Sequence, residues 1–521
     1  MKVLVTGGTG VIGQAAVTEL LRRGHSVRIL SRGAQEVTSQ WPEGVEAWPA
    51  ALTDQNELRG CAEGCDLVLH VAGIMEESPP ESTYEQVNVE GTRLMVREAE
   101  RCKVGRFIYI SSLGADTGTS PYHRSKRRAE EIVRGFAGGW IVLRPGNVFG
   151  PGDEVISLML TMVRTLPAVP VVGGGDHQFQ PIWVEDMATA IGEAVLRTDL
   201  HGQVLELAGE ERTSLNDVLT RIGEITGCQP ARLPIPTFLA NIGVSVASML
   251  GVKLPLTESQ VTMLTEGNWI KTPGTNALTG VFRIKPTPLD SALRKLADSL
   301  PEQTPEKGVG AFKRKRYWID IAGSLLTAEE LFARFRMRFA ELVPLTMDVR
   351  AEPDTPTVLE RSSTITMKLP LRGNVQVRVE ELTEREAVLV TLAGHPLAGA
   401  VRFLSEQVGD ELRFQVQLYD RPANLADWLL MRTVGESVRS SSWEIMLQKL
   451  LTESGGSAAT PVQQEEEALD AEKTERVEAW LRDLIVARKR EQHSAAAEER
   501  PAKASAKRER AESTLGEDAT I

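Results

Sequence analysis

The sequence predicts an α/β protein in which a doubly wound parallel sheet with a small additional lobe is followed by an α+β domain and a disordered tail. Three observations carry this prediction. A glycine-rich turn joins a strand to a helix near residue 10, strands alternate with helical patterns to about residue 150, and strands follow one another after residue 317. At 521 residues and 57.1 kDa, the chain also exceeds what one hydrophobic core usually supports.

The first apolar strand, at residues 3–5, runs directly into a glycine-rich turn and an amphipathic helix. Gly7 and Gly10 allow the backbone to turn tightly and to approach a ligand, and Gly13 allows the helix to pack closely on the strand. The first amides of the helix are free to bind phosphate groups. The turn therefore predicts a pyrophosphate, and hence a dinucleotide, at this position.

The other strands of the parallel sheet are short apolar runs separated by helical patterns. The strands expected are Val3–Val5, Val27–Leu30, Leu67–Leu69, Phe107–Ile110 and Ile141–Leu143, and the helices include Ile12–Arg23 and Tyr84–Arg101. Residues 151–300 lose this alternation and contain glycine- and proline-rich loops. We expect them to form a smaller lobe over a substrate, so that 1–300 is one domain.

Residues 301–316 contain prolines, glycines and the basic run Lys313-Arg314-Lys315-Arg316, and are expected to form a solvated linker. Residues 317–455 are expected to form an α+β domain with a first strand at 317–321, a helix at Thr327–Leu342 and a long closing helix at Asn424–Leu451. Between the helices lie five alternating segments that predict antiparallel strands: Ser363–Leu369, Val375–Glu381, Val388–Leu392, Ala400–Glu406 and Leu412–Tyr419.

Residues 456–521 are rich in Glu, Ala, Lys and Arg. Val477–Arg488 can form an amphipathic helix. Beyond about residue 492 few apolar residues remain to be buried, so disorder is expected there.

The overall charge and the cysteine content exclude several classes of protein. The formal net charge is −12, whereas a general nucleic-acid-binding protein needs a basic surface, so no nucleic-acid partner is expected. Four cysteines are too few for a disulfide scaffold in a chain of this length, which indicates a reducing, cytoplasmic compartment. Met1-Lys2 leads at once into the first strand, so no signal peptide is expected.

The longest uncharged stretch is Leu233–Val252, which is interrupted by prolines and glycines. It falls short of a membrane span of about 20 strongly apolar residues. Two interpretations remain open: a buried helix under the smaller lobe, or a helix on the cytoplasmic face of a membrane or against a protein partner.

Four polar residues that could take part in catalysis follow the strand at 106–110. Ser111-Ser112 ends this strand, and Tyr122 and Lys126 give the pattern Tyr-x-x-x-Lys. Together with the glycine turn, these residues resemble the short-chain dehydrogenase/reductase family, whose extended members include NAD-dependent epimerases and dehydratases. The resemblance implies a Rossmann sheet, a nicotinamide coenzyme and an oxidoreductase or epimerase-like activity on a carbonyl or hydroxyl group.

Two segments resemble the atypical branch of this family, which includes the NADPH-binding accessory subunit of respiratory complex I. They are Ser111–Ala115 and Gln180–Ala188, the latter with Trp183 where a histidine is usual. Some members of this branch bind the dinucleotide as a structural element or redox sensor. The resemblance therefore leaves open a non-catalytic NADPH-binding protein, and it also suggests a homodimer.

The resemblance assigns catalytic roles to Ser112, Tyr122 and Lys126. Tyr122 would transfer a proton to or from the substrate oxygen, and Ser112 would hydrogen-bond that oxygen. An unperturbed phenol has a pKa near 10, and the positive charge of Lys126 one helical turn away is expected to favour the phenolate. Lys126 would also hold the ribose hydroxyls.

The resemblance also identifies the residues that would bind the coenzyme. They are Gly7, Gly10, Val11, Ile12, Gly13, Ser31, Arg32, Asp54, Val71, Ala72, Gly73, Asn88, Ser111, Tyr122, Lys126, Pro145, Asn147 and Val148. Among them, Ser111 is expected on the nicotinamide side and Asp54 at the adenine. Arg32 stands where NAD-selective folds place a carboxylate, and a guanidinium can bind a 2′-phosphate, so NADP(H) is preferred and NAD(H) remains an option.

The order and lengths of the elements in 317–455 resemble the START-like helix-grip arrangement, in which a sheet wraps a helix around an apolar cavity. This resemblance favours an apolar substrate, such as a lipid, quinone or polyketide, although fold analogy also suggests a nucleotide sugar. A third hypothesis makes this domain a lipid carrier that the reductase domain regulates.

Overall fold

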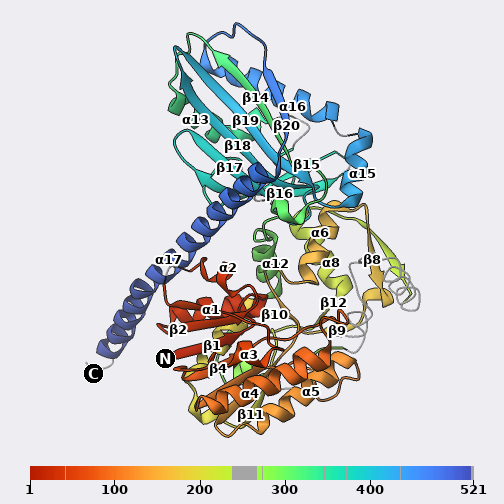
Figure 1. Ribbon diagram of the computed structural model, residues 1–521, viewed down its shortest axis with the longest axis vertical. Helices are drawn as coiled ribbons and strands as arrows, with labels where there is room; N and C mark the ends of the chain where they lie inside the picture. The colour runs from red at the N-terminus through yellow and green to blue at the C-terminus, as the bar shows by residue number, and fades with distance from the viewer. Residues whose placement is uncertain are drawn as a thin grey trace.

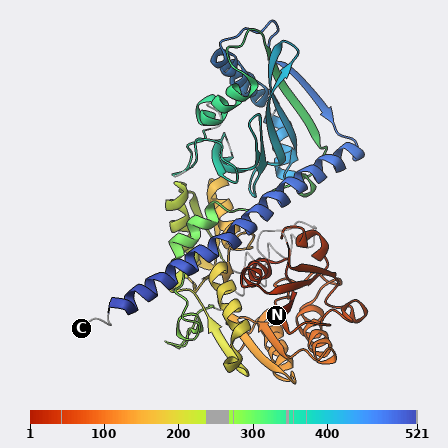
Figure 2. The same ribbon diagram turned by 90° about the vertical axis from the view of Figure 1, so that its left-hand side faces the viewer.

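The computed structural model describes residues 1–41, 43–236, 267–272, 274–343, 348–353, 355–370, 372–434 and 436–517. Two sheet domains lie one above the other in Figure 1, and a long helix, α17 (Ala471–Glu517), extends from the upper domain past the lower one. In Figure 2 the same helix crosses in front of both domains. Most of the stretch Leu233–Val252 lies outside the described residues.

The amino-terminal domain is built on a seven-stranded sheet in the order β11-β6-β5-β4-β1-β2-β3, and every adjacent pair is parallel. The strands are β1 (Lys2–Thr6), β2 (Ser26–Ser31), β3 (Val45–Pro49), β4 (Leu67–His70), β5 (Arg106–Ile110), β6 (Gly139–Pro145) and β11 (Gln203–Leu207). Their apolar side chains alternate between two buried faces, as expected for a sheet covered on both sides. The predicted doubly wound sheet is confirmed.

Helices cover both faces of this sheet. Apolar residues of α1 (Val11–Arg22) and α7 (Val184–Leu196) pack on one face. On the other face lie α3 (Gln55–Leu58), α4 (Gly91–Arg101) and α5 (Pro121–Arg134). A π-helical segment at Glu85–Glu90 precedes α4 within the predicted helix Tyr84–Arg101. The short α2 (Ala34–Thr38) and α11 (Ala277–Gly280) complete the domain.

A smaller lobe packs beside the carboxyl ends of the strands. Its core contains α6 (Ile156–Thr165), α8 (Leu215–Thr226) and α12 (Leu289–Ala297). Three two-stranded ladders accompany these helices: β7 (Val148–Phe149) with β10 (Ile182–Trp183), β9 (Gln178–Phe179) with β12 (Thr213–Ser214), and β8 (Ala168–Val172) with β13 (Ala231–Ile235). Leu392 of the carboxy-terminal domain is buried in the same core, so the lobe and that domain share one apolar cluster.

The carboxy-terminal domain is built on a second seven-stranded sheet, antiparallel throughout, in the order β15-β16-β17-β18-β19-β14-β20. Its strands are β14 (Lys313–Ile321), β15 (Thr364–Leu369), β16 (Gly373–Leu382), β17 (Glu386–Thr391), β18 (Leu397–Val408), β19 (Glu411–Pro422) and β20 (Gln463–Ala468). On the inner face pack α13 (Ala328–Met337), α14 (Phe339–Leu342) and α16 (Glu436–Ser454), the last preceded by α15 (Leu425–Val434). The interior contains a cluster of buried aromatic rings: Phe332, Phe335, Phe339, Phe403 and Phe414.

The basic run at 313–316 is expected in a linker. The structure places it in β14 instead. Lys313 pairs with Glu466, and Arg316 pairs with Glu465 on β20. Arg316 lies directly opposite Glu465, whereas Lys313 reaches Glu466 diagonally, and opposite charges at both kinds of position stabilise an antiparallel pair. Burial of the alternate side chains toward the end of β14 also favours the strand. The carboxylates that neutralise this run lie about 150 residues further along the chain. In the sequence alone, the run therefore has the composition of a solvated segment.

The segment after residue 456 is also more ordered than predicted. It supplies the edge strand β20 and then α17, whose Leu481 and Ile485 are buried against β17 and β18 on the outer face of the sheet. The predicted amphipathic helix Val477–Arg488 lies within α17. Helix α17 continues to Glu517, and Ala, Glu, Lys and Arg have high helix propensity. The disorder expected beyond about residue 492 stays a prediction.

Charged residues join the two domains below the surface. On α6, Arg164 pairs with Glu352 at 2.7 Å, and their side chains are 2% and 7% exposed. On α17, Arg488 pairs with Glu302 at 2.6 Å and with Glu380 of β16 at 2.5 Å. Further along the same helix, the His493 ring stacks on Trp41 of the amino-terminal domain at a centroid distance of 5.5 Å. We call the group Glu302, Arg378, Glu380, Arg488 and Lys489 the domain junction.

No helix in the described part of the chain combines the length and the apolar character that crossing a bilayer requires.

Candidate functional site

The glycine-rich turn after β1 leaves no room for side chains. Gly7 has φ +69°, and a Cβ on it would lie 2.8 Å from the Cα of Ala72. A Cβ on Gly13 would lie 2.1 Å from the carbonyl oxygen of Gly7, because α1 packs directly on the turn. The turn is closed by a hydrogen bond from the Gly10 amide to the Gly7 carbonyl at 3.1 Å. Sterically, glycine is required at positions 7 and 13.

Helix α1 begins at Val11, and no side chain caps its amino terminus. The first amides, including those of Val11 and Ile12, have no partners within the helix, and the helix dipole favours an anion there. Gly10, the N-cap, leaves the approach to these amides open. The turn thus fits the diphosphate of a dinucleotide, as the sequence predicts.

The end of β2 presents two polar residues toward the same turn. The Gly7 amide donates to the carbonyl of Leu30, which places Ser31 and Arg32 directly beyond it. The hydroxyl of Ser31 is buried without a hydrogen-bond partner, and Arg32 is exposed. Within the described residues no carboxylate pairs with Arg32, whereas Arg28 on the same strand pairs with Glu46. The arrangement fits an anionic group near Arg32.

Asp54, the residue expected at the adenine, is the N-cap of α3. Its carboxylate accepts hydrogen bonds from the amides of Asn56 at 2.8 Å and Glu57 at 3.3 Å. This capping role explains its position without a ligand.

The segment after β4 passes close to the predicted catalytic residues. A Cβ on Gly73 would lie 3.1 Å from both Asn88 Oδ1 and Lys126 Nζ. Val71 and Ala72 lead into this point, and the amide of Ala72 donates to Thr6 Oγ1 at 3.2 Å. Only a glycine fits this passage without displacing neighbouring groups.

Asn88 lies in the π-helical segment and is 1% exposed. Its Oδ1 accepts from the Ile74 amide at 2.8 Å, and its Nδ2 donates to Ser125 Oγ at 2.9 Å. Asn88 thereby ties the segment after β4 to α5, next to Tyr122.

Tyr122 lies in the first turn of α5, is 8% exposed, and is hydrogen-bonded to Ser112. The ring of Tyr84 meets it edge-on at a centroid distance of 6.1 Å. Burial raises the pKa of Tyr122 to about 12, and the hydrogen bond with Ser112 acts in the opposite direction. The expectation that Lys126 shifts Tyr122 toward phenolate is therefore wrong for this structure, because burial dominates.

Lys126 is buried one helical turn beyond Tyr122. Its Nζ donates to the Ile110 carbonyl at 2.9 Å and lies 5.0 Å from the centroid of the Tyr109 ring. Burial lowers its pKa to about 8, and Glu130 acts to raise it. The lysine is thus held beside Gly73 and Asn88, where the predicted ribose would pass.

Ser111, which is expected on the nicotinamide side, is hydrogen-bonded to a buried carboxylate. Its hydroxyl donates to Glu130 Oε1 at 2.6 Å, and Glu130 also binds Arg144 of β6. Sequence reasoning missed Glu130 and Arg144. The only local signal is that Glu130 follows Lys126 by four residues and so lies on the same face of α5.

The loop after β6 carries Pro145, Asn147 and Val148. The Pro145 carbonyl accepts from the Leu113 amide at 2.9 Å, so this loop is adjacent to Ser112. Asn147 Oδ1 is buried without a partner, and Val148 pairs with Ile182 in the lobe. The loop thereby joins the strand end that carries Ser112 to the smaller lobe.

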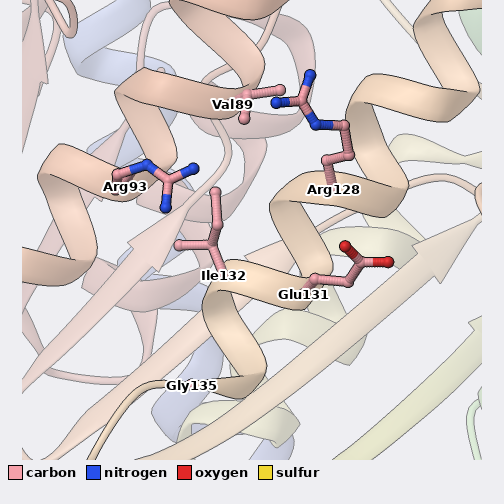
Figure 3. Close-up of a pocket in the computed structure, with 6 residues that line it drawn as sticks. All are labelled: Val89, Arg93, Arg128, Glu131, Ile132 and Gly135. Carbon is pink, nitrogen blue, oxygen red and sulfur yellow. The ribbon is translucent and has the colours of Figure 1, made fainter.

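A surface hollow lies on the outer side of α4 and α5, away from these residues (Figure 3). It is lined by Val89, Arg93, Arg128, Glu131, Ile132 and Gly135, none of which is a predicted site residue. It does not belong to the site described above.

The fold and site define a nicotinamide dinucleotide-binding protein of the short-chain dehydrogenase/reductase type. Residues 3–208 match the NAD dependent epimerase/dehydratase family. The chain is 32% identical over 244 residues to the ceramide reductase of Caulobacter vibrioides, an alignment that covers 46% of this chain and 75% of that protein. The chain belongs to the NAD-dependent epimerase/dehydratase family, and the predicted family resemblance is confirmed.

A second relative bears out the predicted similarity to a complex I subunit. It is the mitochondrial NADH dehydrogenase [ubiquinone] 1 alpha subcomplex subunit 9 of Arabidopsis thaliana, 25% identical over 279 residues, covering 51% of this chain and 69% of that protein. Among solved structures, MoeE5 in complex with UDP-glucose and NAD is 21% identical, with a TM-score of 0.45, and covers 57% of this chain and 97% of that one. Family membership makes the chain an NAD(P)-dependent protein of the oxidoreductase or epimerase type.

Proposed function

We propose that the chain is an NADP(H)-dependent oxidoreductase that reduces a carbonyl group of an apolar small molecule. One observation carries the proposal: Tyr122 is hydrogen-bonded to Ser112 at the carboxyl end of β5, with Lys126 one helical turn away. These groups lie at the edge of the sheet that also carries the glycine turn, where ligands bind in open α/β sheets.

The proposed coenzyme is held by the residues that the geometry leaves available. The amides at the start of α1 would bind the diphosphate, and Lys126 would hold the ribose hydroxyls. The exposed Arg32 and the buried Ser31 hydroxyl, neither of which has a partner among the described residues, would bind the 2′-phosphate, which supports NADP(H) over NAD(H). NADPH, when bound, supplies a hydride.

Each residue of the site has a defined task in carbonyl reduction. Because its pKa is about 12, Tyr122 retains its proton at neutral pH and would donate it from Oη to the substrate oxygen. The hydroxyl of Ser112 orients that oxygen. The charge of Lys126 stabilises the tyrosinate that remains.

The proposed apolar substrate rests on the relative that is named ceramide reductase. The carboxy-terminal domain supports a START-like interpretation in its order of elements, with α16 lying on the inner face of an antiparallel sheet. Its interior is occupied by a cluster of buried phenylalanines, which favours a structural role over lipid carriage. We therefore place the substrate between Tyr122 and the smaller lobe.

The second candidate is a non-catalytic protein in which NADPH occupancy sets the shape or the assembly with a membrane-associated partner. The similarity to a subunit of a mitochondrial NADH dehydrogenase favours it.

Turnover separates the two candidates. NADPH oxidation is followed by absorbance with a panel of long-chain ketones, quinones and ceramide-like carbonyl compounds. If the chain is an enzyme, at least one acceptor should be turned over. Tyr122→Phe should then lower the turnover rate by about 100-fold to 10,000-fold and leave the NADPH affinity unchanged. If NADPH binds tightly but no acceptor oxidises it, the proposal of an oxidoreductase is wrong and the non-catalytic protein is favoured.

A further inference from the structure

Glu130 lies in the interior of the amino-terminal domain, with 1% of its surface exposed. Four hydrogen bonds reach its two oxygens. They come from Ser111 Oγ at 2.6 Å, Arg144 Nε and Nη2 at 2.8 Å each, and Arg134 Nη2 at 3.3 Å. Every donor is a hydroxyl or a guanidinium, so both carboxylate oxygens are hydrogen-bonded below the surface.

Glu130 is linked to the catalytic arrangement in two ways, by charge to Lys126 and by a hydrogen bond to Ser111. On α5 it follows Lys126 by one helical turn, the spacing at which opposite charges attract. Through Ser111 it is also bonded to the strand end that carries Ser112. Arg144 fixes the carboxylate from β6, the strand adjacent to β5.

The surroundings of Lys126 make Glu130 its principal counter-charge. His70 of β4 is buried between Thr6 and Thr92, and burial lowers its pKa to about 3, so it is neutral. Tyr109 of β5 and Tyr122 of α5 both have pKa values raised by burial and are also neutral. Asn88 of the π-helical segment carries no charge.

We propose that Glu130 is a positioning residue of the active site: clamped by Arg144, it holds Lys126 as an ammonium ion and fixes the strand end that carries Ser112. This inference rests on the proposed function, because it gives Glu130 a role through the two residues that would contact coenzyme and substrate. A purely structural role would require only that Glu130 tie α5 to β6.

The test is the pH dependence of NADPH affinity, measured by fluorescence titration of the full chain from about pH 6.5 to about 9.5, a range that brackets the pKa of Lys126. In the wild type the affinity falls as the pH rises through the pKa of Lys126, because the neutral amine holds the ribose less well. In Glu130→Gln the midpoint moves to lower pH by about one unit, because an opposing charge is removed.

Two further variants keep the test decisive. Glu131→Gln removes the neighbouring carboxylate of α5, which is 66% exposed, and leaves the midpoint unchanged. Glu130→Gln combined with Arg144→Met removes both partners of the buried pair, so no unpaired charge remains to unfold the domain, and the midpoint again moves down.

The outcomes separate the two proposals. A midpoint that stays in place in both Glu130 variants, even with a lowered melting temperature, overturns the positioning role and leaves a structural one. Absence of NADPH binding to the wild type at every pH overturns the proposed function, and this inference with it.

Discussion

The proposed coenzyme site and the domain junction both gather polar groups below the surface, but with opposite pairing. At the coenzyme site, Ser31 and Asn147 each have a buried oxygen without a partner, and Arg32 has no carboxylate beside it in the described structure. At the junction, Glu302 pairs with Arg378, Arg488 and Lys489, and Glu380 pairs with Arg488 through Oε2, although its Oε1 has no hydrogen-bond partner among the described residues. Unpaired buried polar groups at the ends of parallel strands indicate a ligand site, whereas the paired charges hold α17 and β16 to the segment at Glu302.

Of the variants considered, Gly13→Ala should have the largest effect, a loss of NADPH affinity. The new Cβ would overlap the Gly7 carbonyl at 2.1 Å, so α1 must move away from the turn. We expect NADPH affinity to fall by about 100-fold or more, measured by calorimetry. Gly33→Ala is the matched control, because open space surrounds its Cβ. Wild-type affinity in Gly13→Ala would show that the diphosphate does not bind at this turn.

Arg488→Met should break the junction instead. It leaves Glu302 and Glu380 buried without this partner, and we expect a loss of about 3–5 kcal/mol in the free energy of unfolding, measured by chemical denaturation. NADPH affinity should change little. The control is Arg476→Met, on the same helix but 70% exposed, which should cost less than about 1 kcal/mol. Equal losses in the two variants would contradict a stabilising junction.

The dependence of the free energy of unfolding on acid pH gives a second test of the junction. Burial opposes ionisation of Glu302, but its three cationic partners prevail and lower its pKa to about 2, below the ordinary value of about 4.3. Its stabilisation is present above the ordinary value and is lost as the pH falls toward about 2. Glu380, whose pKa burial raises, partly offsets this loss. Arg488→Met should therefore lose less stability than the wild type between about pH 4.5 and 2.

The sequence predicts the elements whose signals are local. Strand β1, the turn at Gly7 and α1 follow from adjacent residues, and the antiparallel strands follow from alternation and turn residues. The edge strand β20 could not be predicted in the same way. Its run Glu465-Glu466-Glu467 lacks apolar residues, and only the opposite charges of β14, far away in the sequence, make it a strand.

The candidate site shows the same limit. Tyr122, Lys126 and Ser112 have a recognisable spacing, and the structure places them together. The position of Ser111 depends on Glu130 and Arg144, which come from a helix and a strand that only the tertiary fold brings into contact. The pKa of Tyr122 likewise depends on burial, which a spacing pattern does not encode.

The last prediction concerns coenzyme selection, where the expected effect is smallest. Arg32→Ala should weaken NADPH binding by about tenfold to 100-fold, the value of one hydrogen-bonded charge pair, and should leave NADH binding nearly unchanged. The ratio of the two dissociation constants is measured at fixed ionic strength, since added salt screens an exposed pair. Arg97→Ala, which removes an exposed arginine of α4, controls for the loss of one positive charge. Because Arg32 is exposed and has no ion-pair partner among the described residues, unfolding should be unaffected in this variant. An equal loss for NADH and NADPH would show that Arg32 contacts a part common to both coenzymes rather than the 2′-phosphate.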